Sequence, residues 1–174
     1  MLEIVELPSP NYNERPPGTV IDLVVIHAIS LPPGEFGGGW VERFFCNRLP
    51  AAAHPYFAGI AELKVSAHYF IARDGRLVRF VPEEKRAWHA GVSSFAGRSN
   101  CNDFSLGIEL EGCEQVPFTA AQYRVLELLL EDIRRRHPAV SPERIVGHSE
   151  IAPGRKTDPG PLFDWRRIEI VKKI

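Results

Sequence analysis

Residues 20–27 read Val-Ile-Asp-Leu-Val-Val-Ile-His, a nearly continuous run of β-branched and aliphatic side chains that closes on a histidine. A strand that is apolar at consecutive positions is typical of a sheet covered on both faces. The run therefore predicts a central strand of an α/β fold, with His27 at its carboxyl end. Functional groups of such sheets gather beyond the strand ends, which makes His27 a candidate for chemistry.

Further strands are expected later in the chain. Residues 64–73 and 76–81 flank Asp74-Gly75, a dipeptide that favours a two-residue type I′ hairpin turn. Residues 104–110 and 144–146 have the apolar composition of two more strands. Together with the run that ends at His27, these segments supply the strands of one sheet.

One helix is clearly marked. Thr119 and Gln122 have the spacing of a capping box, which satisfies free amide groups in a first helical turn. From there apolar side chains recur at helical spacing, at Leu126, Leu129, Leu130 and Ile133. The pattern stops at His137-Pro138, and residues 31–39, rich in proline and glycine, predict a loop. We expect an α/β fold with a mixed central sheet flanked by helices.

The composition excludes several classes of protein. The 174 residues suffice for one domain with a buried core, and the net charge of −1 without a basic stripe argues against a nucleic-acid partner. No apolar run approaches the roughly 20 residues that cross a bilayer, and residues 1–10 lack the parts of a secretion signal. The cysteines Cys46, Cys101 and Cys113 have no paired spacing, which fits a reducing compartment. We expect a single domain over residues 1–174 that works as a monomer in the cytoplasm, without a membrane partner.

His27, His148 and Asp158 form a candidate set of metal ligands. His148 follows the short apolar run at residues 144–146, and Asp158 stands in Lys-Thr-Asp-Pro-Gly-Pro, a stretch that its prolines stiffen. Two neutral imidazoles and one carboxylate, with a fourth position left to water, form a common catalytic zinc set. The same donors suit iron(II), and no short metal motif such as HExxH is present, so spacing alone leaves a structural role open.

Glu109 and Glu111 are the second candidate pair. At strand periodicity they point to one face, while Ile108 and Leu110 point to the other. A carboxylate on an apolar strand is costly unless it is paired or faces a cleft, so one of the two is a candidate general acid or base. The alternative is an edge strand with one wet face. Lys156 is either a surface lysine or, two residues before Asp158, a group that stabilises an oxyanion.

Several longer blocks of the sequence are distinctive. They include Val-Ile-His at 25–27, Ala-His-Pro-Tyr-Phe-Ala-Gly-Ile at 53–60, Lys-Arg-Ala-Trp-His-Ala-Gly-Val-Ser-Ser at 85–94, Cys-Asn-Asp-Phe-Ser-Leu-Gly-Ile-Glu-Leu-Glu-Gly at 101–112, and Gly-His-Ser-Glu-Ile-Ala-Pro-Gly-Arg-Lys-Thr-Asp-Pro-Gly-Pro at 147–161. These blocks resemble the AmpD family of bacterial 1,6-anhydro-N-acetylmuramyl-L-alanine amidases, which is related to phage amidase-type lysozymes and peptidoglycan-recognition proteins. The resemblance covers about residues 8–168, and several blocks in one order are more specific than any single motif.

The resemblance implies a zinc amidase of the α/β class and assigns the central residues. It makes His27, His148 and Asp158 the ligands of one Zn²⁺ ion. Glu109 matches the family's catalytic acid and base, which leaves Glu111 as a supporting residue. The implied reaction is metal-assisted hydrolysis of the amide between N-acetylmuramic acid and L-alanine.

Other positions match the family with different degrees of fit. Lys156 matches a lysine that stabilises the transition state, and Trp88 and His89 lie in a block that resembles part of the substrate groove. Ala28 stands where asparagine is expected, and Glu150 where aspartate is more usual. Neither departure removes a ligand or a catalytic group, so they bear only on contacts to sugar or peptide.

The resemblance also implies a substrate. With no export signal in residues 1–10, we expect a small muropeptide inside the cell, a 1,6-anhydro-N-acetylmuramyl peptide of peptidoglycan recycling. Residues 36–40 and 51–60 are long for connections in a compact domain, and we expect them to act as lids or binding loops that restrict the groove.

Four alternatives remain beside this function. A wall-lytic amidase acting on polymeric peptidoglycan would use the same chemistry. Non-catalytic peptidoglycan-binding modules of this fold typically lack a metal ligand, whereas this chain has all three. A non-haem iron oxygenase is disfavoured by the long spacing from His148 to Asp158 and by the missing HxD motif. A glycosidase needs two carboxylates that flank a bond, whereas Glu109 and Glu111 project in parallel from one strand.

Overall fold

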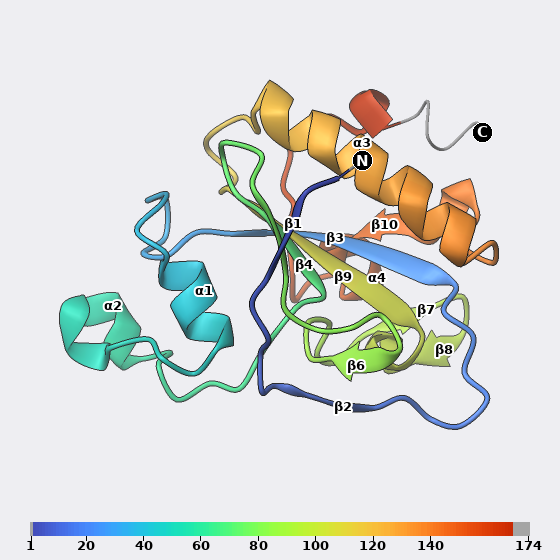
Figure 1. The fold of residues 1–174 in the computed structure, drawn as a ribbon, viewed down its shortest axis with the longest axis horizontal. Helices are drawn as coiled ribbons and strands as arrows, with labels where there is room; N and C mark the ends of the chain where they lie inside the picture. The colour runs from blue at the N-terminus through green and yellow to red at the C-terminus, as the bar shows by residue number, and fades with distance from the viewer. Residues whose placement is uncertain (1, 169–174) are drawn as a thin grey trace.

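A six-stranded sheet in the order β1-β5-β4-β9-β3-β10 forms the centre of the molecule (Figure 1). The computed structural model describes residues 2–168, so the domain expected over residues 1–174 extends beyond them at both ends. The strands are β1 (Ile4–Glu6), β3 (Leu23–Ile29), β4 (Tyr69–Ile71), β5 (Leu77–Arg79), β9 (Ser105–Glu111) and β10 (Ile145–Gly147). Only β4 and β5 pair antiparallel within this sheet. The expected α/β class with a mixed sheet is confirmed.

The two long strands β3 and β9 lie side by side within the sheet, and their alternate side chains serve two purposes. Val24 and Ile26 of β3 belong to the main apolar core, which also contains the inner face of α3 (Ala120–Arg136). Figure 1 shows α3 lying across this side of the sheet. The alternate residues of the strand, Val25 and His27, project to the opposite face. The helix therefore covers one face, and the polar residues of β3 and β9 gather on the other.

Two expectations about these strands need correction. The predicted strand at residues 20–26 begins at Leu23 and runs to Ile29, so His27 lies within the strand and does not end it. The extension is stabilised by parallel pairing with β9, which reaches Glu111 opposite Ile29. β9 is also no edge strand, because β4 and β3 flank it on its two sides. Its carboxylates are therefore buried.

Helix α3 begins and ends where the sequence predicts. The Thr119 hydroxyl accepts from the Gln122 amide at 3.1 Å, and the Gln122 side-chain oxygen accepts from the Thr119 amide at 3.0 Å. These reciprocal bonds form the expected capping box. The helix ends at Arg136, and His137 is its C-cap.

The hairpin between β4 and β5 is confirmed, but its turn is of another type. A type I′ turn needs positive φ at both central residues, and only Gly75, at 91°, has it. The Ala72 amide donates to the Arg76 carbonyl at 3.0 Å, which closes a three-residue loop over Arg73, Asp74 and Gly75. This arrangement fits the common turn in which glycine supplies one left-handed residue after two ordinary ones.

Short elements surround the sheet. The helices are α1 (Trp40–Phe45), α2 (Pro55–Ala58) and α4 (His148–Ile151), the strands are β2 (Tyr12–Glu14), β6 (Lys85–Ala87), β7 (Ser94–Phe95) and β8 (Arg98–Ser99), and the 3₁₀ turns are η1 (Ala51–Ala53), η2 (Cys101–Asp103), η3 (Pro142–Arg144) and η4 (Trp165–Ile168). α1 and α2 are absent from the sequence prediction because each is under two turns long, too short for helical periodicity to show. Within residues 2–168, no helix combines the length and apolar character that a membrane crossing requires.

Glu83 joins the end of α3 to the sheet through a partly buried polar cluster. Its carboxylate accepts from the Tyr69 hydroxyl at 2.7 Å, from Arg136 at 2.7 Å and from His137 at 2.8 Å. Burial alone would raise the pKa of Glu83, but the bonds from Arg136, Tyr69 and His137 outweigh it and lower the pKa to about 2. The folded state therefore favours the ionised carboxylate.

We expect Glu83→Gln to lower the free energy of unfolding by about 1–3 kcal/mol at pH 7. Because the folded-state pKa is depressed, this stabilisation is present above the unfolded-state pKa near 4.5 and is lost as the pH falls toward 2. Urea unfolding of both proteins between pH 7 and pH 3 measures the difference. Glu84→Gln, at an exposed neighbour, is the control and should behave like the unchanged chain. A difference that stays constant across this range would contradict the assignment.

Candidate metal centre and active site

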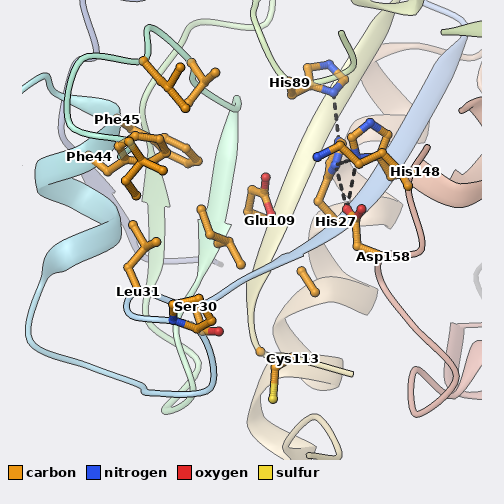
Figure 2. A pocket seen from close by; sticks show the side chains of 18 of the residues that line it. His27, Ser30, Leu31, Phe44, Phe45, His89, Glu109, Cys113, His148 and Asp158 are labelled. Atoms are coloured by element: carbon orange, nitrogen blue, oxygen red, sulfur yellow. Dashed lines mark hydrogen bonds and ion pairs between the residues drawn. The ribbon is translucent and has the colours of Figure 1, made fainter. Parts of the chain in front are cut away.

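Three side chains from separate segments bring one donor atom each to a common point. The Nδ1 atoms of His27 and His148 lie 3.0 Å apart, and Asp158 Oδ2 lies 3.2 Å from the first and 3.1 Å from the second. Figure 2 shows the three side chains converging beside the pocket. Among residues 2–168, this is the one grouping of three histidine, cysteine or carboxylate donors that fits a metal ion. The candidate ligand set is thus assembled in the structure.

Hydrogen bonds alone do not explain this triangle. The His148 Nε2 atom lies 3.1 Å from the Ala90 carbonyl oxygen, which can only accept, so Nε2 carries the proton. In a neutral ring, Nδ1 of His148 then presents a lone pair toward Asp158 and His27. Lone pairs at this separation repel one another unless a cation lies between them. Atoms 3.0–3.2 Å apart can all reach one ion at about 2.0–2.2 Å, the distance typical of zinc–nitrogen and zinc–oxygen bonds.

The sheet register places the two histidines together. β10 pairs in parallel with β3 so that Gly147 lies opposite Ile26, and the next residue of each segment is a histidine. His148 opens α4, whose residue Ser149 donates its amide to the Asp158 carbonyl at 3.0 Å. This bond ties the loop that carries the carboxylate to the helix that carries the imidazole.

The protonation states of the cluster are those a metal ion requires. Burial lowers the pKa of His27 to about 4, because an imidazolium in the interior loses its hydration. Burial acts to raise the pKa of Asp158, but its close contacts with the His148 and His27 imidazoles outweigh burial, and the pKa is lowered. The site therefore combines a neutral imidazole with an ionised carboxylate, as metal binding demands.

Glu109 stands next to His27 on the same face of the sheet. The two residues are register partners of the parallel strands β3 and β9, and Figure 2 shows the Glu109 side chain pointing into the pocket. Only 9% of Glu109 is exposed, and its Oε2 atom is buried without a hydrogen-bond partner. Burial, and secondarily the charge of Asp158, raises the pKa of Glu109 well above its ordinary value. A carboxyl group in this setting can hold a proton and release it to a reacting partner.

Glu111, two residues along the strand, has a different environment. Its Oε1 atom accepts from the Gly37 amide at 2.5 Å and its Oε2 atom from the Arg73 amide at 3.0 Å. Both oxygens are therefore committed to the backbone, one to the glycine-rich loop and one to the hairpin turn. Glu111 therefore has a structural role, whereas Glu109 lines the cavity and has one oxygen without a partner.

The donor cluster and Glu109 open into a cavity of about 510 Å³. One wall is polar and includes Lys156 beside the cluster. The opposite wall is apolar and comes from Leu31, from α1 and from the segment after α1, with Phe44, Phe45, Tyr56, Ile60, Leu63 and Val65. The binding loop expected over residues 51–60 supplies Tyr56 and Ile60, but the other residues of this wall were not predicted. Two of its large side chains, Tyr56 and Leu63, are 44% and 50% exposed.

The remaining predicted residues also lie at or near the cavity. Trp88 lines it, and its indole nitrogen donates to Asn13 Oδ1 at 3.1 Å. His89 lines it too, but both of its ring nitrogens contact protein atoms, Nε2 of His27 and Oγ of Ser105. Ala28 is a lining residue, and Glu150 instead accepts from the Gly147 amide at 2.9 Å, so Glu150 caps α4.

Comparisons with known proteins agree with this geometry. Residues 17–161 match the family of N-acetylmuramoyl-L-alanine amidases. The chain is 54% identical over 168 residues to the 1,6-anhydro-N-acetylmuramyl-L-alanine amidase AmpD of Citrobacter freundii, covering 97% of this chain and 89% of the relative. A crystal structure of a selenomethionine AmpD derivative superposes with a TM-score of 0.94 at 53% identity, covering 98% of this chain and 95% of that one.

A more distant solved structure contains a ligand. It is the N-acetylmuramyl-L-alanine amidase AmiD of E. coli, in complex with the substrate anhydro-N-acetylmuramic acid-L-Ala-D-γ-Glu-L-Lys. The present chain is 29% identical to it with a TM-score of 0.65, over 92% of this chain and 65% of that one.

Proposed function

The chain belongs to the N-acetylmuramoyl-L-alanine amidase family, and we propose that it hydrolyses its amide with a zinc ion held by His27, His148 and Asp158. The bond cut is the amide between 1,6-anhydro-N-acetylmuramic acid and L-alanine in muropeptides, as in the relatives of about half-identical sequence. One observation supports the proposed chemistry above the others. Three metal-binding donors meet beside Glu109, a buried carboxyl group that lines the same cavity and has one oxygen without a hydrogen-bond partner.

In this proposal Glu109 moves the protons of the reaction. When bound, zinc supplies a positive charge that polarises the amide carbonyl and lowers the pKa of water. Glu109 takes a proton from the attacking water and returns it to the alanine nitrogen as the amide breaks. The raised pKa of Glu109, caused first by burial, supports the second step, because a carboxyl that binds its proton more firmly can hold it until the alanine nitrogen accepts it.

Lys156 is the proposed partner of the developing oxyanion. It lines the cavity, and its charge acts on both His27 and Glu109 across the site. The carbonyl oxygen gains negative charge only as the tetrahedral species forms, and a nearby ammonium group stabilises that charge. Trp88, on the cavity wall, is the proposed contact to the substrate.

We expect Lys156→Ala to lower kcat by about 10–100-fold with a smaller change in KM, because the charge is needed chiefly in the transition state. Steady-state hydrolysis of a purified anhydro-muropeptide measures both constants. Arg155→Ala is a poor control because its guanidinium binds the Ala90 carbonyl, so Lys64→Ala, an exposed lysine outside the donor cluster, serves instead. A rise in KM at unchanged kcat would assign Lys156 to substrate binding.

We further propose a place for the reaction: peptidoglycan recycling by a monomer in the cytoplasm. All three donors and the catalytic carboxyl come from one chain, so the site is complete without a second copy. The free thiols of Cys46, Cys101 and Cys113 fit a reducing compartment. Sedimentation of the purified protein tests the monomeric state, and fractionation of cells tests the cytoplasmic location.

The substrate preference is tested by competition. We expect kcat/KM for a soluble 1,6-anhydro-muropeptide to exceed that for intact sacculi by at least about tenfold, because the segment at residues 51–60 borders the groove through Tyr56 and Ile60 and restricts access by long glycans. Mass spectrometry of mixtures of the two substrates, with and without a chelator, measures the released peptide. Equal or faster release from sacculi would favour a wall-lytic amidase with the same zinc chemistry.

A further inference from the structure

The metal-facing atoms of His27 and His148 define which ring nitrogen must carry a proton. A neutral imidazole has one proton, and both rings turn Nδ1 toward the donor cluster. In each ring, therefore, Nε2 must be protonated for Nδ1 to bind a metal ion. Whatever accepts the two Nε2 protons sets the tautomer and the orientation of the ligands.

Both acceptors come from one dipeptide, His89-Ala90. The Nε2 atom of His27 lies 2.9 Å from His89 Nδ1, and the Nε2 atom of His148 lies 3.1 Å from the Ala90 carbonyl oxygen. For His89 to accept at Nδ1, its own proton must be on Nε2, which lies 3.1 Å from Ser105 Oγ. Each ring can therefore donate from Nε2 to the next residue, His27 to His89 and His89 to Ser105.

The dipeptide is itself held by one side chain, Asn102. The Oδ1 atom of Asn102 accepts from the His89 amide at 3.1 Å and from the Ala90 amide at 2.8 Å. The backbone carbonyl of Asn102 in turn accepts from Arg15 at 3.1 Å, so hydrogen bonds hold both the side chain and the backbone of Asn102. A single amide oxygen therefore locates the partners of both histidine ligands.

Gly107 of β9 has no side chain and so leaves room for the His89 ring. A Cβ atom on Gly107 would lie 2.4 Å from His89 Cγ, closer than real atoms approach. Gly107 precedes Glu109 by two residues and lies on the same face of β9, opposite Val25. The strand that carries Glu109 thus also admits the ring that orients His27.

We propose that His89 and Asn102 are positioning residues for the metal centre, which hold His27 and His148 in the tautomer that binds metal through Nδ1. The inference rests on the proposed zinc site. It gives His89 a different task from the substrate contact expected from the sequence, because both of its ring nitrogens contact the protein. His89 and Asn102 touch no ligand atom of the metal directly, so their effect is on affinity.

Two isosteric pairs of variants test this role. His89→Leu removes the acceptor for His27. His89→Asn introduces a side chain with the branched shape of leucine, but it places an oxygen near the position of Nδ1. Asn102→Leu removes the acceptor for the dipeptide, whereas Asn102→Asp keeps it. The measurement is the zinc Kd, by competition with a chromophoric chelator, together with urea unfolding of the metal-free proteins. His137→Leu, at a histidine that bonds Glu83 outside the site, is the control for general loss of stability.

We expect both leucine variants to weaken zinc binding by about 10–100-fold, and the Asn and Asp variants to stay within about threefold of the unchanged chain. In ¹⁵N-detected spectra of the zinc-loaded protein, the Nε2 proton of His27 should be protected from exchange, and His89→Leu should remove that protection. His137→Leu should alter unfolding without altering the zinc Kd. Unchanged zinc affinity in His89→Leu, in a chain that binds zinc, would overturn the positioning role alone. Failure of the unchanged chain to bind zinc would overturn the proposed metal site and this inference together.

Discussion

His27→Ala is expected to abolish stoichiometric zinc binding and to lower kcat/KM by roughly 10³-fold or more. Three protein ligands leave no redundancy, so removing one donor weakens the site as a whole. The metal's contribution to transition-state stabilisation amounts to several kcal/mol, and each 1.36 kcal/mol is a factor of ten in rate. Elemental analysis of the dialysed protein measures zinc per chain, and muropeptide hydrolysis measures the rate. His148→Ala and Asp158→Ala should give the same double loss.

The control for this prediction is His54→Ala. His54 caps α2 through a bond from the Tyr56 amide and lies outside the donor cluster, so this variant should keep about one zinc per chain. The ligand assignment would be wrong if His27→Ala retained one zinc per chain and full activity.

Glu109→Ala is expected to retain zinc and lower kcat by about 10²–10⁴-fold, the usual contribution of a general acid and base. Zinc is retained because Glu109 contributes no donor atom to the cluster of His27, His148 and Asp158. Glu109→Gln preserves the shape of the side chain but cannot exchange the proton, so it should be nearly as slow. The kcat of each variant, measured on protein with verified zinc content, separates catalysis from metal binding.

Glu111→Ala is the matched comparison on the same strand. It removes the acceptor of the Gly37 and Arg73 amides, and each lost hydrogen bond costs about 0.5–1.5 kcal/mol. The main effect should therefore appear in urea unfolding, with a much smaller fall in kcat than for Glu109→Ala. A fall in kcat as large as that of Glu109→Ala, in a folded and zinc-loaded protein, would contradict the division of roles.

Much of the fold was predictable because local rules agreed with tertiary packing. The apolar run before His27 is buried on both faces as predicted, and the capping box at Thr119 starts α3 as predicted. The strand boundary at His27 was wrong, because pairing with β9 extends β3 to Ile29 and pairing partners are not visible in a single segment. The turn at Asp74-Gly75 was assigned the wrong type, since loop length depends on where the ladder closes.

The residues that gather at the candidate site were predictable, but the different environments of Glu109 and Glu111 were not visible in local spacing. Strand periodicity places Glu109 and Glu111 on one face and cannot separate them. They differ because Gly37 and Arg73, distant in sequence, donate to one carboxylate and not to the other. The apolar wall likewise depends on α1 packing against the sheet, and no local pattern marks it. The roles of Asn102 and Gly107 beneath His89 also arise only from the fold.

The spacing of the donors has a consequence for the newly synthesised chain. His27 and Asp158 are 131 residues apart, an interval that takes roughly 7 to 26 s at typical translation rates. During that time the first ligand has been made and the last has not. β10, whose pairing aligns His148 with His27, is also among the last segments of the described chain to be synthesised. The three candidate ligands are therefore complete only after Asp158 has been synthesised, and any product terminated before Asp158 lacks a complete donor set.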